Sequence, residues 1–438
     1  MAHVARGDVP IPVRETFFGA SLCALKKPDD GVRPIAVGLS LRRLSTKTLL
    51  TPLSGELGSH LRPTQLGYGT KGGCEAAVHA ARHLLETSTE PIVLVKLDIK
   101  NAFNTIRRDK LMLEVESKIP TLYPYFHAAY SGHTRLFFGE DMIPSQTGLQ
   151  QGDPGAPALF SLGIHNAIST LKSRLNMWYL DDGTLADHPD IVLEDIKKLI
   201  PDMEALGLDF NSSKCEIFTM NMRNEEEVLE KFKRVLPAIR QISHEELSLL
   251  GSPFTVQGAQ KAITDRKAAL DRMSDRLEKI DQHEAFTILR CALSLPKLLY
   301  LLRSSLAYKC TTALQDFDET MRRTLCKIVN IELPEDSWVQ ATLPIAMGGI
   351  GLRCATHVAL PAFLASTASS SRLVRTLLES FDSAESDRWS EATTAWKALA
   401  DTEAAPPNEE QICSQRSWDI PLAETFSAEQ TNLPERGT

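Results

Sequence analysis

Two adjacent carboxylates stand where they could do chemistry. The stretch Tyr179-Leu180-Asp181-Asp182-Gly183 places them between two short apolar runs. Asp182-Gly183 is a strong hairpin signal, because both central residues of such a tight turn need a positive φ. Neighbouring negative charges repel each other unless a cation neutralises them. An ordinary acidic surface turn would explain this pair alone, so the catalytic interpretation depends on a further acid.

That further acid is Asp98, which follows the apolar run of residues 91–97. Such a run is typical of a strand buried on both faces, where an unpaired charge is costly. Asp98 and Asp181, each carried by a strand, could share two Mg²⁺ ions, or Mn²⁺, because hard cations bind carboxylates together with substrate phosphates. Paired ions stabilise the attacking and leaving oxygens of a phosphoryl displacement. The acids therefore predict nucleotidyl transfer.

Further motifs accompany these acids in a fixed order. They are Asp98 with Ala102-Phe103, Gln150-Gln151-Gly152-Asp153-Pro154 with Ala158-Leu159-Phe160, Tyr179-Leu180-Asp181-Asp182, Gly207-Leu208 with Asn211 and Lys214, and Leu249-Leu250-Gly251. In order and spacing the chain resembles the reverse transcriptase domain of a non-LTR (LINE-like) retrotransposon protein. The resemblance implies an α+β fold of the right-hand polymerase type, with an antiparallel palm sheet plus helices, partial fingers and an all-helical thumb.

The resemblance also assigns roles to the acids and to one aromatic residue. Asp98 and Asp181 would bind both metal ions, and Asp182 would bind less directly or tune the site. Phe103 would form a wall that leaves no room for a 2′-hydroxyl, so that deoxynucleotides are selected. An ordinary core aromatic at a junction between strand and helix is the structural alternative for Phe103.

Other matched residues would contact the nucleotide. Gln151 and Gly152 would line its pocket, since glycine lets the backbone approach a substrate closely. Asp153-Pro154 would open a helix, with aspartate as its N-cap. Asn211 would belong to the substrate site, and Lys214 would donate a proton to the departing pyrophosphate. A solvated lysine explains Lys214 equally well.

Basic residues near the N-terminus would complete the site. Residues 25–37 predict two short strands around an Asp-Gly turn. In the family this fingers hairpin binds the triphosphate, for which the guanidinium of Arg33 is well suited. Either Lys26 or Lys27 would be the accompanying lysine.

A glycine-rich stretch at residues 67–72 satisfies the G-x-G-x-x-G pattern. A dinucleotide site requires a strand directly before the first glycine. The preceding residues 60–65 contain a proline and few apolar side chains, so this interpretation is rejected. Gln65-Leu66-Gly67-Tyr68 instead resembles a loop that contacts the template.

Composition sets broad limits. The chain has 438 residues, 43% of them hydrophobic, with a net charge of −8. No apolar run approaches the 18 or more residues of a membrane span, no signal peptide is visible, and the cysteines occur singly. We expect an intracellular protein, nuclear or cytoplasmic, without a membrane or zinc. Its partners would be an RNA template, a DNA primer and deoxynucleoside triphosphates.

The acidic net charge is unfavourable for binding a nucleic-acid duplex. Basic clusters could nevertheless line a groove: Arg42-Arg43, Arg107-Arg108 with Lys110, Arg266-Lys267 with Arg272 and Arg276, and Arg322-Arg323.

The expected domains follow from the same patterns. Residues 1–90 would be partial fingers and 91–258 the palm, with a helical fingers insertion at about 109–145. Residues 259–375 would form the helical thumb and the segment after it, beginning with an amphipathic helix through Ile263, Leu270 and Leu277. Residues 376–438 are acidic and are expected to be largely disordered.

Retroelement proteins of this type also carry an endonuclease, which would have to come from another chain. The fingers begin late, as in a truncated protein. Besides an RNA-directed DNA polymerase, the sequence therefore leaves open an inactive retroelement fragment that binds nucleic acid. It also leaves open another palm-type enzyme, either an RNA-templated RNA polymerase or a terminal transferase.

Overall fold

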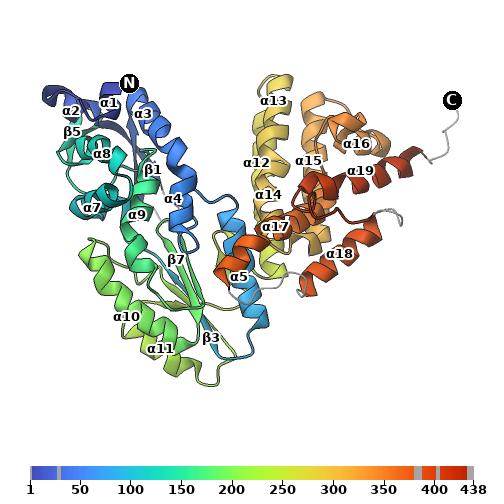
Figure 1. Cartoon of the computed structure of the whole chain (residues 1–438). Helices are drawn as coiled ribbons and strands as arrows, with labels where there is room; N and C mark the ends of the chain where they lie inside the picture. Colours follow the sequence, from blue (N-terminus) through green and yellow to red (C-terminus); the bar gives the residue numbers. More distant parts are fainter. Residues whose placement is uncertain (1, 27–30, 379–386, 401–404, 432–438) are drawn as a thin grey trace. The chain divides into compact units, whose positions relative to one another are not determined.

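The computed structural model describes residues 2–26, 31–378, 387–400 and 405–431. The chain divides into two units, one of residues 1–74 and 87–241 and the other of residues 75–86 and 242–438. Each unit has its own core of buried apolar side chains. Figure 1 shows both units, with labels on many of their helices and strands.

A five-stranded sheet in the order β6-β7-β3-β8-β9 is central to the first unit. Its strands are β3 (Ile92–Leu97), β6 (Leu175–Tyr179), β7 (Asp182–Asp187), β8 (Glu216–Met220) and β9 (Arg240–Gln241). β3 pairs antiparallel with β7 and with β8. Five of its six residues are buried, as its continuous apolar sequence predicts. The predicted antiparallel palm sheet is confirmed for β6, β7, β3 and β8, whereas the short β9 joins β8 in parallel.

The tight turn between β6 and β7 differs from the predicted one by two residues. Tyr179 pairs with Asp182, so the two loop residues are Leu180 and Asp181. Leu180 has φ 58°, whereas Asp182 and Gly183 already belong to β7. Gly183 serves packing, because a Cβ there would lie 2.6 Å from the ring of Trp178. The Asp-Gly turn prediction was therefore wrong in position, although the hairpin exists.

A second sheet of the first unit has the order β2-β1-β4-β5. The expected hairpin is formed by β1 (Ala20–Lys26) and β2 (Val32–Gly38), paired antiparallel. β4 (Thr134–Phe138) and β5 (Asp141–Ser145) form another hairpin, and β4 joins β1 in parallel. Residues 134–145 thus form a β-hairpin, and the prediction of a helical insertion was wrong for them. Thr134, Phe137 and Phe138 are of residue types that favour strands.

Helices complete the first unit. They are α1 (Ala2–Ala5), α2 (Ile11–Phe17), α3 (Ser40–Leu50), η1 (Thr51–Leu53), α4 (Ser54–Leu61), α6 (Ala102–Thr105), α7 (Arg108–Lys118), η2 (Pro120–Leu122), α8 (Tyr123–Tyr130), α9 (Ala156–Ile168), α10 (Pro189–Ala205) and α11 (Glu225–Lys233). Buried residues of α9 and α10 share one core with Val93, Val95 and Leu97 of β3. This core fixes the strand whose end carries Asp98.

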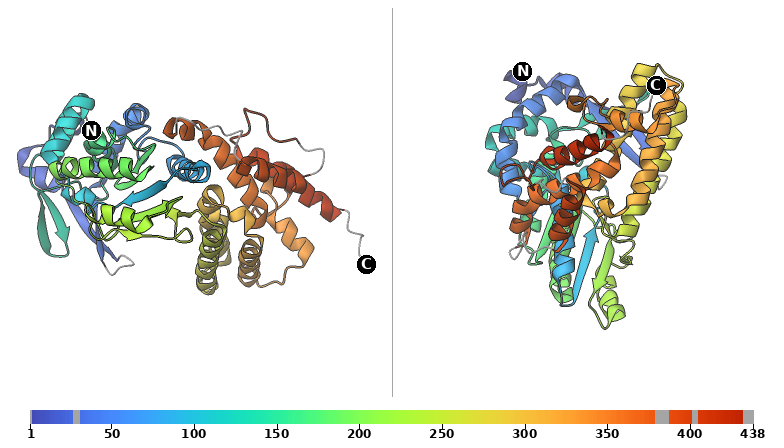
Figure 2. Two further views of the ribbon diagram at one scale, coloured as in Figure 1. Left: turned by 90° about the horizontal axis from the view of Figure 1, so that it is seen from below. Right: turned by 90° about the vertical axis from the view of Figure 1, so that its right-hand side faces the viewer.

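In its described residues, the second unit is helical apart from a short hairpin, β10 (Ser248–Leu249) with β11 (Ser252–Pro253). Its helices are α5 (Gly73–Thr87), α12 (Val256–Leu277), α13 (Gln282–Ile288), the π-helix η3 (Leu289–Leu293), α14 (Leu295–Ser304), η4 (Ala307–Lys309), α15 (Thr311–Val329), α16 (Glu335–Thr342), η5 (Ile345–Met347), α17 (Ala355–Leu377), α18 (Asp387–Leu399) and α19 (Gln415–Thr431). Ile263, Leu270 and Leu277 of α12 enter its core, as the amphipathic pattern predicts. Figure 2 shows yellow α12 running beside orange α15.

Two segments belong to other units than the sequence suggested. Residues 75–86 were assigned to the fingers and 242–258 to the palm, but both lie in the helical unit. Polar contacts explain the first case. Glu75 accepts hydrogen bonds of 2.8 and 2.9 Å from Arg303 and one of 2.7 Å from Ser366, and Arg82 donates to the carbonyl of Pro253.

In the described residues after 376 the tail contains α18 and α19, so the expectation of disorder was wrong for these two segments. Residues 379–386, 401–404 and 432–438, to which the same expectation applied, lie outside the described residues. The indole of Trp396 donates to the carbonyl of Trp418 at 2.8 Å, and both side chains are fully buried. Arg353 holds Asp419 of α19 with two hydrogen bonds of 2.6 and 2.8 Å. Disorder was inferred from an acidic composition, but three tryptophans supply enough apolar surface for a small core.

Gln282–Ser304 is long and apolar enough to cross a membrane by length and composition, contrary to the sequence-based expectation. Leu289, Leu298, Leu301 and Leu302 of this segment lie in the core of the second unit. Core helices satisfy the same criterion, so one such segment is weak evidence for a membrane span.

Candidate functional site

A cleft of about 1010 Å³ in the first unit collects most of the predicted site residues. Its lining comes from the fingers hairpin, the end of β3, the loop before α9, the β6–β7 turn and the segment before β8. The predicted residues that line it are Arg33, Asp98, Phe103, Gln151, Gly152, Asp181, Asn211 and Lys214. Stretches that are far apart in sequence therefore meet at one hollow.

The acids meet because of strand register. Leu97 pairs with Gly183, so the end of β3 carrying Asp98 lies beside the turn carrying Asp181 and Asp182. Loss of hydration, followed by repulsion from Asp98, raises the pKa of the Asp181 carboxyl. Loss of hydration and repulsion from Asp181 and Asp98 raise the pKa of Asp182 to about 6. The turn thus concentrates negative charge that a cation would neutralise.

Gln65 holds this turn and was not among the predicted site residues. Its side-chain amide donates to the carbonyl of Leu180 at 3.0 Å and accepts from the Leu180 N–H at 2.8 Å. The same oxygen accepts from the N–H of Gly67 at 2.9 Å. Gln65 is fully buried, so these bonds are shielded from water. Sequence placed it in a template loop, because nothing local links it to residue 180.

Asn211 and Lys214 reach the cleft through backbone pairing with the end of β3. The Asn211 N–H donates to the carbonyl of Asp98 at 2.7 Å, and Ile99 forms a bridge with Phe210. Lys214 is exposed, in a turn where its N–H donates to the carbonyl of Asn211. Residues 212–214 thus form a turn, which is followed by β8.

Phe103 is half-buried and lines the cleft from α6. Its ring stacks on that of Phe160, with 4.7 Å between centroids and 22° between planes. Phe160 belongs to α9 and is fully buried. The ring of Phe103 thus has a rigid backing on one side and the cleft on the other. The role of Phe103 as a wall for the sugar stays a prediction.

The fingers hairpin and the glycine loop are joined by backbone. The N–H of Ala36 in β2 donates to the carbonyl of Gln151 at 2.6 Å. Gly152 has φ 117°, and a Cβ there would lie 2.5 Å from the carbonyl oxygen of Ala36. Glycine is therefore required by both conformation and space. The contact brings Arg33, on the same strand as Ala36, to the cleft with Gln151.

Of the two candidate lysines of the hairpin, the structure describes Lys26 and not Lys27. Lys26 pairs with Val32, while Arg33 pairs with Leu25. Neighbouring positions of a strand point to opposite faces, so Lys26 and Arg33 lie on different faces of the hairpin. Lys26 is not among the cleft-lining residues of the described chain. Lys27 lies outside the described residues, and the choice between the two remains a prediction.

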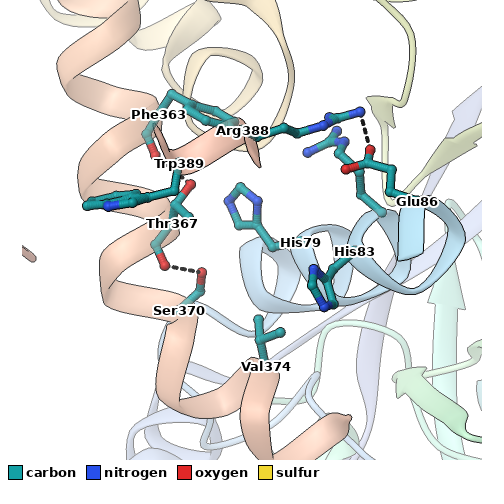
Figure 3. Close-up of a pocket in the computed structure, with 10 residues that line it drawn as sticks. His79, His83, Glu86, Phe363, Thr367, Ser370, Val374, Arg388 and Trp389 are labelled. Carbon is teal, nitrogen blue, oxygen red and sulfur yellow. Dashed lines mark hydrogen bonds and ion pairs between the residues drawn. The ribbon is translucent and has the colours of Figure 1, made fainter. Parts of the chain in front are cut away.

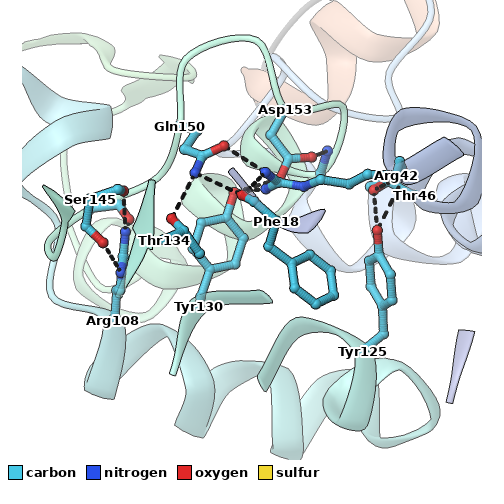
Figure 4. Close-up of polar contacts among 12 residues, drawn as sticks. Phe18, Arg42, Thr46, Arg108, Tyr125, Tyr130, Thr134, Ser145, Gln150 and Asp153 are labelled. Carbon is cyan, nitrogen blue, oxygen red and sulfur yellow. Dashed lines mark hydrogen bonds and ion pairs between the residues drawn. The ribbon is translucent and has the colours of Figure 1, made fainter. Parts of the chain in front are cut away.

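A buried polar network lies behind the glycine loop (Figure 4). Arg42 donates to Asp153 at 2.5 Å and to the side-chain oxygen of Gln150 at 2.6 Å. The hydroxyl of Tyr130 donates to the same Asp153 oxygen at 2.6 Å. Asp153 is therefore the partner of a buried guanidinium and not the N-cap of α9, which begins at Ala156 after Gly155. Together, these hydrogen bonds fix the loop that contains Gln151.

Most arginines and lysines of the predicted basic clusters form hydrogen bonds or ion pairs within the protein. Arg42 is buried, and Arg108 donates to the carbonyls of Gly148 and Ser145. Other members of the clusters pair with carboxylates: Arg107 with Asp109, Lys267 and Arg323 with Asp271, and Arg322 with Glu335. Arg42 is buried and cannot line a groove, so the interpretation was wrong for this residue. For the exposed members of the clusters, contact with nucleic acid stays a prediction.

The donor set of the cleft fits a hard divalent cation. Asp98 and Asp181 offer carboxylate oxygens, which Mg²⁺ prefers, often using only one or two from the protein. Within the described ranges, no group of three or more His, Cys, Asp or Glu side chains is close enough to hold a metal ion. A cation here would therefore depend on oxygens from the substrate as well.

Comparisons with known proteins agree with this geometry. Residues 25–254 match the model of the reverse transcriptase (RNA-dependent DNA polymerase) family. The retrotransposable element SLACS 132 kDa protein of Trypanosoma brucei gambiense is 23% identical over 369 residues, covering 81% of this chain and 30% of that protein. The Pol polyprotein from type-2 retrotransposable element R2DM of Drosophila melanogaster is 24% identical over 242 residues, covering 50% and 22%. The chain thus spans less than a third of these relatives.

Two solved structures are also similar. Apo telomerase from Candida tropicalis, truncated from its C-terminal domain, has a TM-score of 0.41 and 12% identity, covering 55% of this chain and 53% of that one. The RNA-dependent RNA polymerase of a human picorbirnavirus has a TM-score of 0.42 and 15% identity, covering 70% and 58%. Because the family match covers more than half of the chain and contains the acids, the glycine loop and the hairpin, this protein belongs to the reverse transcriptase family, with retrotransposon proteins as its relatives.

Proposed function

We propose that this chain catalyses RNA-directed DNA synthesis, adding deoxynucleotides to the 3′-hydroxyl of a DNA primer on an RNA template. The observation that carries the proposal is that Asp98 and Asp181 line one cleft together with Phe103 and Gln151. Two acids at a hollow of this size suit a nucleoside triphosphate and its metal ions. Membership of the reverse transcriptase family supports the same reaction.

The metal requirement we propose is two Mg²⁺ ions, for which Mn²⁺ could substitute. Asp98 and Asp181 would hold them, with Asp182 nearby in the turn. Such ions, when bound, stabilise the attacking and leaving oxygens of an in-line displacement. The raised pKa values of Asp181 and Asp182 support a site that is completed by cations.

The other cleft residues would position the substrate. The exposed guanidinium of Arg33 would bind triphosphate oxygens, as a planar fork of donors can. The ring of Phe103, backed by Phe160, would exclude a ribose 2′-hydroxyl. Gln151 and Asn211 would contact the nucleotide. Lys214 would protonate the departing pyrophosphate, since its exposed ammonium lines the same cleft.

The test is incorporation of labelled deoxynucleotides on a primed RNA template with Mg²⁺. We expect the wild type to extend the primer and Asp181→Asn to reduce extension to background, with circular dichroism showing an intact fold. Unchanged extension by Asp181→Asn would refute the proposal. Salt-sensitive RNA binding without any incorporation by the wild type would instead identify an inactive fragment.

Two further reactions distinguish the remaining palm-type enzymes. Preferential use of ribonucleotides on the same template would indicate an RNA-templated RNA polymerase. Incorporation that continues without any template would indicate a terminal transferase. We expect neither, because the wall formed by Phe103 disfavours ribonucleotides.

A further inference from the structure

A small cavity in the second unit lies between α5, α17 and α18 (Figure 3). Its volume is about 40 Å³. The polar side chains that line it are His79, Arg82, His83, Glu86 and Arg388, and aromatic and small side chains close the rest. We call it the arginine cavity. None of its residues takes part in the polymerase cleft of the first unit.

Arg82 is buried there with unused hydrogen-bond donors. Only 3% of the residue is exposed, and its guanidinium lies over the ring of Phe254 at 5.1 Å. Its Nη2 donates to the carbonyl of Pro253 at 3.1 Å. Its Nε and Nη1 have no hydrogen-bond partner among the described residues. Unmade bonds of a buried guanidinium are costly, so something that accepts them is expected.

Arg388 adds another donor of the same kind. It forms an ion pair with Glu86, which Figure 3 shows as a dashed line. Its Nη1 is buried and, within the part of the chain that the structure describes, has no partner. Arg82 and Arg388 both line the cavity, and together they carry three nitrogens that have no partner among the described residues. Two such guanidinium groups at one cavity favour an acceptor-rich ligand.

The charge of the lining is also unbalanced. Two guanidinium groups, Arg82 and Arg388, stand against one carboxylate, Glu86. Burial lowers the pKa of His79 to about 3 and lowers that of His83, so both imidazoles are neutral at pH 7. α17 contributes no charged side chain to the lining. The lining residues thus carry one more positive charge than negative charge.

The hydroxyl groups of the cavity do not compete for such a ligand. Thr367 donates to the carbonyl of Phe363 at 3.0 Å, and Ser370 donates to that of Ser366 at 2.7 Å. The free donors are therefore those of the arginines. One water needs roughly 10–15 Å³ of such space, so the cavity has room for a group of a few heavy atoms and none for a nucleoside.

We propose that the arginine cavity binds a phosphate group through Arg82 and Arg388. Inorganic phosphate and the terminal phosphate of a nucleotide chain share this chemistry. Guanidinium donors match phosphate oxygens in charge and geometry. The bound anion would supply the missing partners of Arg82 and tie α5 to α18.

The experiment is equilibrium dialysis of the full chain against radiolabelled inorganic phosphate at constant ionic strength. Arg33→Gln removes a phosphate-binding group of the polymerase cleft and should leave binding at the arginine cavity unchanged. Arg82→Met and Arg388→Gln should each weaken this binding by tenfold or more. Arg322→Gln is the matched control, because Arg322 is paired with Glu335 elsewhere in the second unit and should behave as wild type.

Thermal unfolding provides a second measurement. Phosphate should raise the midpoint of the wild type, because a ligand that binds only the folded state stabilises it, and should raise it less in Arg82→Met. If Arg82→Met does not fold, the proposal is judged on Arg388→Gln, which changes a half-buried residue. A 5′-phosphorylated dinucleotide that displaces the label identifies a chain end as a ligand, and failure to displace it assigns the site to free phosphate. Equal binding by all variants, or none by the wild type, would overturn the proposal and leave only water in the cavity.

Discussion

The side-chain amide of Gln65 forms two hydrogen bonds with the backbone of Leu180, one to its carbonyl and one from its N–H. Leu180 has φ 58°, a conformation that non-glycine residues rarely adopt. The two bonds compensate for this conformation and fix the turn. Because Asp181 follows directly, these bonds also fix the position of the carboxylate that we propose binds metal ions.

Gln65→Leu should therefore impair catalysis more than binding. Loss of the amide leaves buried backbone groups unpaired, which costs about 1–3 kcal/mol of stability. Displacement of Asp181 by about 1 Å would lower kcat by about 10²-fold, with little change in KM. Steady-state primer extension and urea unfolding measure these effects. Gln260→Leu, on an exposed face of α12, is the control, and an equal loss of activity there would contradict the positioning role.

Phe103→Ala should relax sugar discrimination. Without the ring, the cleft has room for a 2′-hydroxyl, so the ratio of deoxynucleotide to ribonucleotide incorporation should fall by about 10-fold or more, equivalent to about 1.4 kcal/mol. Competing nucleotides in single-turnover extension measure the ratio. Phe160→Leu removes the stacked backing from outside the cleft and should have a smaller effect. If discrimination is unchanged in Phe103→Ala, the ring is only a core residue.

Arg42→Met should destabilise the first unit strongly. It leaves Asp153 buried without its guanidinium partner, and breaking a buried pair in this way costs about 3–5 kcal/mol. The adjacent Arg43 is exposed, so Arg43→Met should change stability by less than about 0.5 kcal/mol. Chemical unfolding followed by circular dichroism compares them. Similar stabilities would mean that the pair contributes little.

Acid should destabilise the second unit through His79. Its pKa is about 3 in the folded chain and 6.5 in an exposed histidine. Below pH 6.5 the unfolded chain takes up a proton that the folded chain does not, so stability falls as the pH falls from about 6.5 towards 3. The slope is about 1.4 kcal/mol per pH unit for one such group. His357, with a pKa lowered to about 4, acts in the same direction.

His79→Gln isolates this contribution. Between pH 6 and pH 4, the free energy of unfolding of the variant should depend on pH less steeply than that of the wild type, by the contribution of about one proton. Urea unfolding followed by tryptophan fluorescence measures it. Asp318 works against the histidines, because burial raises its pKa to about 6 and it stabilises the fold as the pH falls below that value. The comparison between variant and wild type cancels this term. Identical pH profiles would show that His79 is protonated in the folded chain.

Much of the site could be predicted because its signals are local. A buried apolar run marks β3 and so places Asp98 at the end of a strand. The paired acids and the glycine loop likewise stand in short, characteristic patterns. In the structure, strand register brings these residues to one cleft. Because antiparallel strands pair in a regular pattern, this register can be anticipated from the sequence.

The remainder depends on contacts between distant residues. Arg42 and Arg43 look alike in sequence, and the partners that distinguish the buried Arg42, Asp153 and Gln150, lie 111 and 108 positions away. The β6–β7 turn moves to Leu180 because Gln65 holds it and Gly183 is needed beneath Trp178. For the tail, Trp389, Trp396 and Trp418 were a signal of folded structure that acidic composition obscured.

The placement of β3 between β7 and β8 has a consequence for chain-length variation. Each neighbour pairs with β3 residue by residue. Deleting or inserting one codon within the strand would turn its last side chains over, so that a carboxylate now facing the hollow would face away from it. Such indels should therefore be lethal to catalysis, while the connection between β4 and β5, at exposed Gly139 and Glu140, should accept extra residues and so offers a place to attach a label.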